Sequence, residues 1–152
     1  ETGQGPSFES RIHAIQMAEV EVNTDTGEIR VIRVTTAVDP GTVINPHNLE
    51  GQLHGGMDQG VGFALREEYV HGQTKDWVTF KFPTMKTAFD MDVIINQTPR
   101  RKGPLGATGV GEMTMVCTAP AVTNAIYDAC GVWIYDLPAT PDKIKAALVC
   151  RP

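Results

Sequence analysis

The feature that most limits how this chain can fold is a helix-like segment with an unusual number of glycines. From about His47 to Arg66, apolar residues recur at helical spacing, and Asn45 followed by Pro46 is a typical helix start. Within twelve residues the segment contains Gly51, Gly55, Gly56, Gly60 and Gly62. Each glycine inside a helix costs about 1 kcal/mol relative to alanine. The pattern therefore predicts close packing against another backbone or a bound cofactor, which a plain surface helix would not need.

The other segments predict an α+β fold with a hairpin, short strands and three helices. Two alternating stretches, 13–23 and 28–38, flank turn residues at 24–27 and predict a β-hairpin. Further short strands are expected at 77–82, 92–95 and 132–135. Two more helices are expected, at 120–129 and 141–148. Neither an internal repeat nor a domain boundary interrupts residues 1–152, which predicts a single segment.

Composition and charge exclude several classes of function. The net charge is −5 and no basic stripe is present, which argues against a nucleic-acid partner. No apolar run approaches the ~20 residues that a membrane span requires. The three cysteines form no C-x-x-C pair, so neither a disulfide framework nor a zinc or iron–sulfur site is indicated. We expect reduced thiols in a cytoplasmic protein.

A glycine-rich loop followed by a carboxylate is the first candidate site. Gly103, Gly106, Gly109 and Gly111 lead directly to Glu112. Successive backbone N–H groups in such a loop suit an anionic or polar ligand, but the spacing fits neither a dinucleotide fingerprint nor a phosphate-binding P-loop. Glu112 has two interpretations at this point: a general base, or a favourable charge at the first turn of a helix.

Gln52, between Gly51 and the Gly55-Gly56 pair, is the second candidate. Its amide can donate to and accept from a ligand that lies on the backbone, or it can be a polar residue on the exposed side of a helix. His47 and His54 have no companions at metal-ligand spacing, so no metal ligand is predicted in the chain. Asp39 is expected to orient the adjacent turn, and Glu67-Glu68 to lie on a solvated face.

Taken together, these segments resemble the carboxy-terminal part of the molybdopterin-binding subunit of the xanthine dehydrogenase and aldehyde oxidoreductase family. The resemblance extends over nearly the whole chain and rests on four motifs in the family's order. These are the hairpin strand 17–22, the segment 39–62 with its glycine-rich helix, the loop 103–112, and the terminal stretch 120–138. The aldehyde oxidoreductase branch is the nearest in pattern.

The resemblance implies a role for each candidate residue. Glu112 matches the family's catalytic glutamate, the base in a hydroxylation that uses water-derived oxygen. Gln52 and the backbone N–H groups of Gly109, Val110 and Gly111 match contacts to the cofactor. The implied cofactor is molybdopterin with molybdenum, in its plain or cytosine dinucleotide form. Iron–sulfur clusters, with FAD as an option, are implied on partner subunits.

The chain is several times shorter than the family's molybdenum subunit, which implies that something else completes it. The rest of the molybdenum subunit is expected either as a separate polypeptide or as the remainder of a longer product. An iron–sulfur subunit and a small-molecule substrate are expected as further partners. Aldehydes, purines and other N-heterocycles all remain open as substrates, and so does the electron acceptor. One alternative stays open, a non-catalytic assembly or interaction domain of the same fold. A small independent ligand-binding domain would leave the five glycines of one helix unexplained unless a partner covered them.

Overall fold

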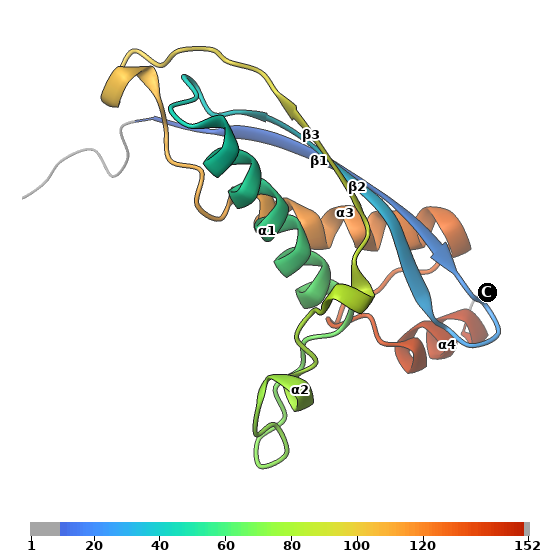
Figure 1. The fold of residues 1–152 in the computed structure, drawn as a ribbon. Coiled ribbons are helices and arrows are strands. Elements are labelled where there is room, and N and C mark those ends of the chain that lie inside the picture. The colour runs from blue at the N-terminus through green and yellow to red at the C-terminus, as the bar shows by residue number, and fades with distance from the viewer. Residues whose placement is uncertain (1–9, 151–152) are drawn as a thin grey trace, which may run out of the picture.

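The fold is a three-stranded mixed sheet with its helices packed on one face (Figure 1). A computed structural model describes residues 10–150. The strands are β1 (His13–Val22), β2 (Ile29–Asp39) and β3 (Asp90–Ile95), in the order β1-β2-β3. β1 and β2 are antiparallel, and they confirm the predicted hairpin, whereas β2 and β3 are parallel. A parallel pair needs a crossover between its strands, and a long helix provides it here.

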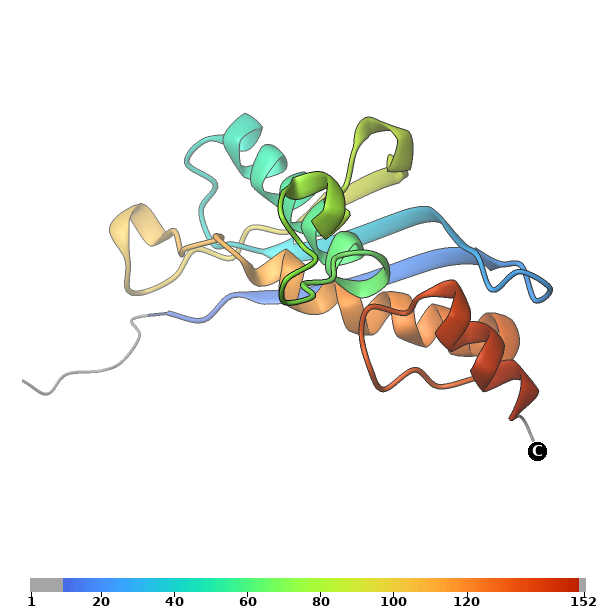
Figure 2. The same cartoon turned by 90° about the horizontal axis from the view of Figure 1, so that it is seen from below.

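The crossover helix is α1 (Pro46–Leu65), followed by α2 (Trp77–Phe80) and the 3-10 turn η1 (Met85–Thr87). A second 3-10 turn, η2 (Pro104–Gly106), lies in the loop after β3, and the chain continues with α3 (Met113–Cys130) and α4 (Pro141–Val149). The start of α1 is confirmed, since the Asn45 side chain accepts a hydrogen bond from the Asn48 N–H and Pro46 opens the helix. The segment that holds α2 projects away from the sheet (Figure 1), so that in the view from below it is seen in front of the rest of the fold (Figure 2).

The core lies between one face of the sheet and the pair of helices α1 and α3. Val34, Thr36 and Val38 point inward from β2 and are buried. Leu53 and Met57 of α1 are fully buried, as are the inward residues of α3. The main cluster includes Val34, Met57, Val61, Ala64, Ala119, Val122, Ile126 and Ile144. Burying this apolar surface holds both helices against the same face of the sheet.

The outer face of the sheet carries no helix of residues 10–150 and is partly apolar. Ile15, Ala37 and Ile94 form one cross-strand row on this face. Ile15 and Ile94 are 77% and 58% exposed, and Met17, in the neighbouring row, is 59% exposed. Farther along, the outer face becomes charged, where Arg33 is paired with Asp90 and Asp92. The described residues thus form two layers, and the partly apolar outer face of the sheet is left open.

Three predictions about local structure were wrong. Residues 77–82 are not a strand, because Asp76 and Thr79 form a capping box that starts the short helix α2. Residues 132–135 form no strand either and belong to the loop between α3 and α4. The predicted helix 120–129 begins seven residues earlier, at Met113, so Pro120 lies inside α3. The three longer helices therefore agree with the predicted α+β class, with α2 as an addition.

Within the described part of the chain, the helices are all too short or too polar to cross a bilayer.

Candidate functional site

The two candidate sites predicted separately from the sequence lie next to each other. Gln52, two turns into α1, donates a hydrogen bond from Nε2 to the carbonyl oxygen of Gly111 at 3.1 Å. Gly111 immediately precedes Glu112, which is the residue before α3. Both Gln52 and Glu112 are exposed in this chain. The fold therefore places the glutamine and the glutamate on one open surface, although they are sixty residues apart in the sequence.

Close approach of α1 and α3 makes this contact possible. A Cβ at Gly56 would overlap the Thr114 hydroxyl, and one at Gly60 would overlap the Thr118 side chain. These two glycines confirm that the glycine-rich helix is closely packed, here against the threonine side chains and the first turn of α3. Gly62 is likewise crowded, with a Cβ position 2.5 Å from Pro83.

The other two glycines of α1 have a different environment. A Cβ at Gly51 or Gly55 would have no atom within 4 Å, and the same holds at Gly109 and Gly111 in the loop. These open positions lie on either side of Gln52 and just before Glu112. Nothing among the described residues requires glycine there for lack of room, so the space is available to a group that is not part of this chain.

The loop before Glu112 is held firmly in its first half and lightly in its second. The N–H of Thr42 donates to Gly106 O, and the N–H of Thr108 donates to Pro40 O, each at 3.0 Å. Between Gly109 and Gly111, by contrast, no hydrogen bond among residues 10–150 uses the backbone N–H groups. The Val110 side chain packs on a small cluster with Leu49 and Leu53. The loop thus leaves a run of uncommitted donors directly before the glutamate.

Asp39, at the end of β2, fixes the loops on which this arrangement rests. Its Oδ1 accepts hydrogen bonds from the N–H groups of Gly41 and Thr98, and it lies 3.3 Å from the Arg100 guanidinium. Hydrogen bonds from Thr98 and Gly41, with the positive charge of Arg100, lower the pKa of Asp39 to about 2. The expectation that Asp39 orients the adjacent turn is confirmed.

Glu112 occupies the N-cap position of α3, but its side chain makes no capping hydrogen bond. Its carbonyl oxygen accepts from the Val116 N–H at 3.3 Å, so the backbone begins the helix while the carboxylate is not used for capping. The N-terminus of a helix carries a partial positive charge that favours a nearby carboxylate. This position fits a base held at a fixed point, and it also fits a simple first-turn charge.

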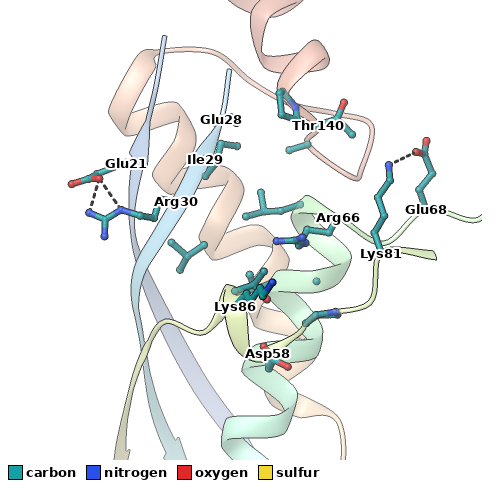
Figure 3. Close-up of a pocket in the computed structure, with 18 of the residues that line it drawn as sticks. Glu21, Glu28, Ile29, Arg30, Asp58, Arg66, Glu68, Lys81, Lys86 and Thr140 are labelled. Carbon is teal, nitrogen blue, oxygen red and sulfur yellow. Dashed lines mark hydrogen bonds and ion pairs between the residues drawn. The ribbon is translucent and has the colours of Figure 1, made fainter. Parts of the chain in front are cut away.

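A large hollow lies elsewhere, at the hairpin end of the molecule (Figure 3). It has a volume of about 1190 Å³ and lies between the β1–β2 hairpin, the end of α1, the segment around η1 and the start of α4. Burial raises the pKa of Asp58 on its wall. Burial, and then the charge of Asp58, also raises the pKa of Glu67. Glu67 is half-buried, with its Oε1 out of contact with solvent, whereas a solvated face was predicted. Neither Gln52 nor Glu112 lines this hollow.

A smaller, mostly apolar hollow of about 440 Å³ lies beside α3 and includes Phe63, Val116, Pro120 and Tyr135. Across residues 10–150, no three His, Cys, Asp or Glu side chains are grouped to hold a metal ion. The candidate site at Gln52 and Glu112 is therefore an open surface of hydrogen-bonding groups and small residues rather than an enclosed cavity.

Two residues that shape the site were missed from the sequence. Thr114 and Thr118 are fully buried against the glycines of α1, but they lie before the predicted start of their helix. The sequence contains a pattern that could have predicted this contact: the two threonines are four residues apart, and so are Gly56 and Gly60. Two small-residue pairs at this spacing are typical of helices that pack closely.

Comparison with known proteins identifies relatives over nearly the whole chain. The family described as "Molybdopterin cofactor-binding domain" matches residues 1–89. The aldehyde oxidoreductase of Megalodesulfovibrio gigas is 39% identical over 149 residues, which covers 97% of this chain and 16% of that protein. The nicotine 6-hydroxylase large subunit of Paenarthrobacter nicotinovorans is 33% identical over 150 residues, 93% of this chain and 18% of the relative.

A solved structure has the same fold. The aldehyde oxidoreductase from Desulfovibrio gigas superimposes with a TM-score of 0.89 and 38% identity, over 91% of this chain and 16% of the larger one. The chain thus spans less than a fifth of each of these relatives.

Proposed function

This chain belongs to the family of molybdopterin-binding subunits that includes the xanthine dehydrogenases and aldehyde oxidoreductases, and we propose that it supplies the catalytic base and part of the cofactor cradle of a molybdenum hydroxylase. Glu112 is the base. Gln52 and the backbone N–H groups of Gly109, Val110 and Gly111 contact the cofactor. The observation that carries the proposal is the hydrogen bond from Gln52 to Gly111, which unites the two candidate sites on one surface.

The residues around Gln52 and Glu112 fit a molybdopterin. Gly51, Gly55, Gly109 and Gly111 leave room for a planar polar group to approach the backbone. Three successive N–H groups at 109–111 have no partner among residues 10–150 and can donate to it. The Gln52 amide has one N–H committed to Gly111, which leaves its second N–H and its oxygen for the cofactor.

When bound, the molybdenum cofactor supplies an activated oxygen derived from water and accepts two electrons from the substrate. The contribution of this chain is to hold a carboxylate where a proton must be removed. The carboxylate of Glu112 makes no capping bond, so it can take that proton without breaking α3. Its exposure in this chain means that another part of the enzyme must cover it and exclude water.

The rest of the enzyme is proposed to come from outside these 152 residues. The single segment 1–152 is completed by the remainder of a molybdenum subunit, either on the same polypeptide or as a separate chain. An iron–sulfur subunit, with FAD as an option, carries the electrons away. The cofactor is molybdopterin in its plain or cytosine dinucleotide form, and the substrate is an aldehyde or an N-heterocycle.

The test is the Glu112→Gln variant in the assembled enzyme. Glutamine keeps the size and hydrogen bonding of the side chain but cannot accept the proton, so turnover should fall by roughly 10²–10⁴-fold. Molybdenum content should remain near wild type, because the loop's backbone donors are unchanged. Asp128→Asn, an exposed carboxylate later in the same helix, is the matched control and should leave turnover unchanged.

Full activity of Glu112→Gln would contradict the proposal. It would favour the alternative that this chain is a non-catalytic assembly domain of the same fold. In that alternative Glu112 is a first-turn charge, and its loss lowers the free energy of unfolding by only about 0.3–1 kcal/mol.

A further inference from the structure

The positions of α1 and α3 are linked by residues that recur along one face of each helix. Gln52, Gly56 and Gly60 are spaced four residues apart and so lie on the same side of α1. They face Gly111, Thr114 and Thr118 in that order. We call this set of contacts the α1–α3 seam. Because Gly56 and Gly60 have no side chains, the helix backbones come close enough for a glutamine side chain one turn earlier to reach the loop.

The seam is also connected to the sheet. The Thr118 hydroxyl lies 2.8 Å from Gln16 Oε1 on β1 and 2.8 Å from the carbonyl oxygen of Thr114. Gln16 in turn donates from Nε2 to the Thr36 hydroxyl on β2 at 2.9 Å. Thr36 and Thr118 are fully buried. Buried polar groups with partners at this distance fix relative positions, because a shift of one leaves another unsatisfied.

At the site end of the seam, only Gln52 holds the second half of the loop through a hydrogen bond. Contacts from Pro40 and Thr42 end at Thr108. From Gly109 to Gly111 the sole hydrogen bond among the described residues is the one that the Gly111 carbonyl accepts from Gln52. The peptide unit that contains this carbonyl also contains the N–H of Glu112. Its orientation therefore sets the direction in which Glu112 leaves the loop.

We propose that Gln52 is a positioning residue for Glu112, and that it acts through the Gly111 carbonyl at a distance set by the α1–α3 seam. This inference rests on the proposed function and extends it. In that function Gln52 contacts the cofactor, whereas here its first N–H holds the glutamate in place. A base that is displaced by about 1 Å can lose up to 10²-fold in rate, so a single hydrogen bond at this carbonyl has a measurable effect.

The experiment compares two variants of Gln52 in the assembled enzyme. Gln52→Ala removes the side chain, and Gln52→Glu keeps its length but, when ionised, has no hydrogen to donate. Gln59→Glu places the same charge two turns later on α1, at an exposed residue, and is the matched control. Three measurements are made: turnover kinetics (kcat per bound molybdenum, and KM), molybdenum content, and hydrogen exchange of the backbone amides of residues 116–118, which begin with the first hydrogen-bonded amide of α3.

We expect both Gln52 variants to lower kcat by about tenfold or more with KM within about twofold of wild type. Exchange at 116–118 should be about three- to tenfold faster, because the Val116 N–H donates to the carbonyl oxygen of Glu112 and loses protection when the Gln52 hydrogen bond no longer holds this end of the helix. Gln59→Glu should change neither kcat nor the exchange rates. Loss of molybdenum with unchanged kcat per metal and unchanged exchange would overturn the inference and leave Gln52 as a cofactor contact. Wild-type behaviour in all three measurements would also overturn it.

Failure of the proposed function gives a different result. If the assembled wild-type protein contains no molybdenum, or Glu112→Gln is fully active, the proposed function is wrong. Faster exchange at 116–118 in both Gln52 variants would then still support the contact between Gln52 and the loop, because exchange does not depend on turnover.

Discussion

Neighbouring glycines on α1 should respond to alanine with opposite changes in stability. Gly55 and Gly56 are both inside the helix, so each substitution gains about 1 kcal/mol in helix propensity. At Gly55 the new methyl group meets nothing within 4 Å, and the gain should appear in full. At Gly56 it overlaps the Thr114 hydroxyl and comes within 2.9 Å of Thr114 Cβ and 3.3 Å of the Met115 nitrogen.

The overlap at Gly56 cannot be relieved by one side-chain rotation, because it involves backbone and a Cβ atom. Overpacking of this kind costs about 1–3 kcal/mol. Subtracting the gain in helix propensity leaves a net loss of about 0–2 kcal/mol. Gly55→Ala should therefore be more stable than Gly56→Ala by about 1–3 kcal/mol.

Urea unfolding of the 152-residue chain, followed by circular dichroism, measures both free energies. Adding Thr114→Ala to Gly56→Ala removes the overlapping hydroxyl and should recover part of the loss. A double-mutant cycle over these two positions should then give a coupling energy of at least about 0.5 kcal/mol. Equal stabilisation by both alanines, or a coupling energy near zero, would refute the reasoning that α1 and α3 are in backbone contact at Gly56.

Two further predictions concern acid stability and cofactor retention. Because the pKa of Asp39 is lowered to about 2, its ionised form stabilises the fold above its ordinary pKa of 3.8, and this stabilisation is lost as the pH falls through about 2. The urea concentration at the unfolding midpoint should therefore decrease as the pH is lowered from 4 to 2, and it should decrease less in Asp39→Asn. The same dependence of the midpoint on pH in both proteins would contradict this. The chain purified alone should not retain molybdenum, because its site is an open surface. Stoichiometric metal in the isolated chain would show otherwise.

Local sequence patterns were sufficient for the elements with strong end signals. The start of α1 follows from Asn45 and Pro46, and the hairpin follows from alternation around a turn that contains Gly27. The start of α3 was missed because Pro120 resembles a first helical residue. Proline in a helix interior removes a hydrogen bond to the residue four positions earlier, and packing of α3 on β1 and α1 overrides that local preference. Aromatic and β-branched residues at 77–82 favoured a strand, but the capping box at Asp76 and Thr79 starts a helix instead.

The candidate site was likewise predicted only in part from the sequence. Gln52 and Glu112 were each predicted from glycines beside them in the sequence. Their proximity could not be predicted from those patterns, because it depends on the packing of two helices whose contact residues, Thr114 and Thr118, lay outside any predicted element. The partial burial of Glu67 was missed for a similar reason. Burial raises the pKa of this carboxyl first, and the charge of Asp58, nine residues earlier in the chain on α1, raises it further.

The open face of the sheet has a practical consequence for handling this chain. β1 is an edge strand of the sheet that the described residues form, and its two halves differ. Beyond the irregularity at Glu19 and Val20, the strand carries Glu19 and Glu21, and charges and bulges discourage another strand from adding there. The first half displays Ile15 and Met17 beside the free edge without such protection. Self-association of the chain during expression should therefore begin at residues 13–17, and a lysine at position 15 is the simplest way to improve its solubility.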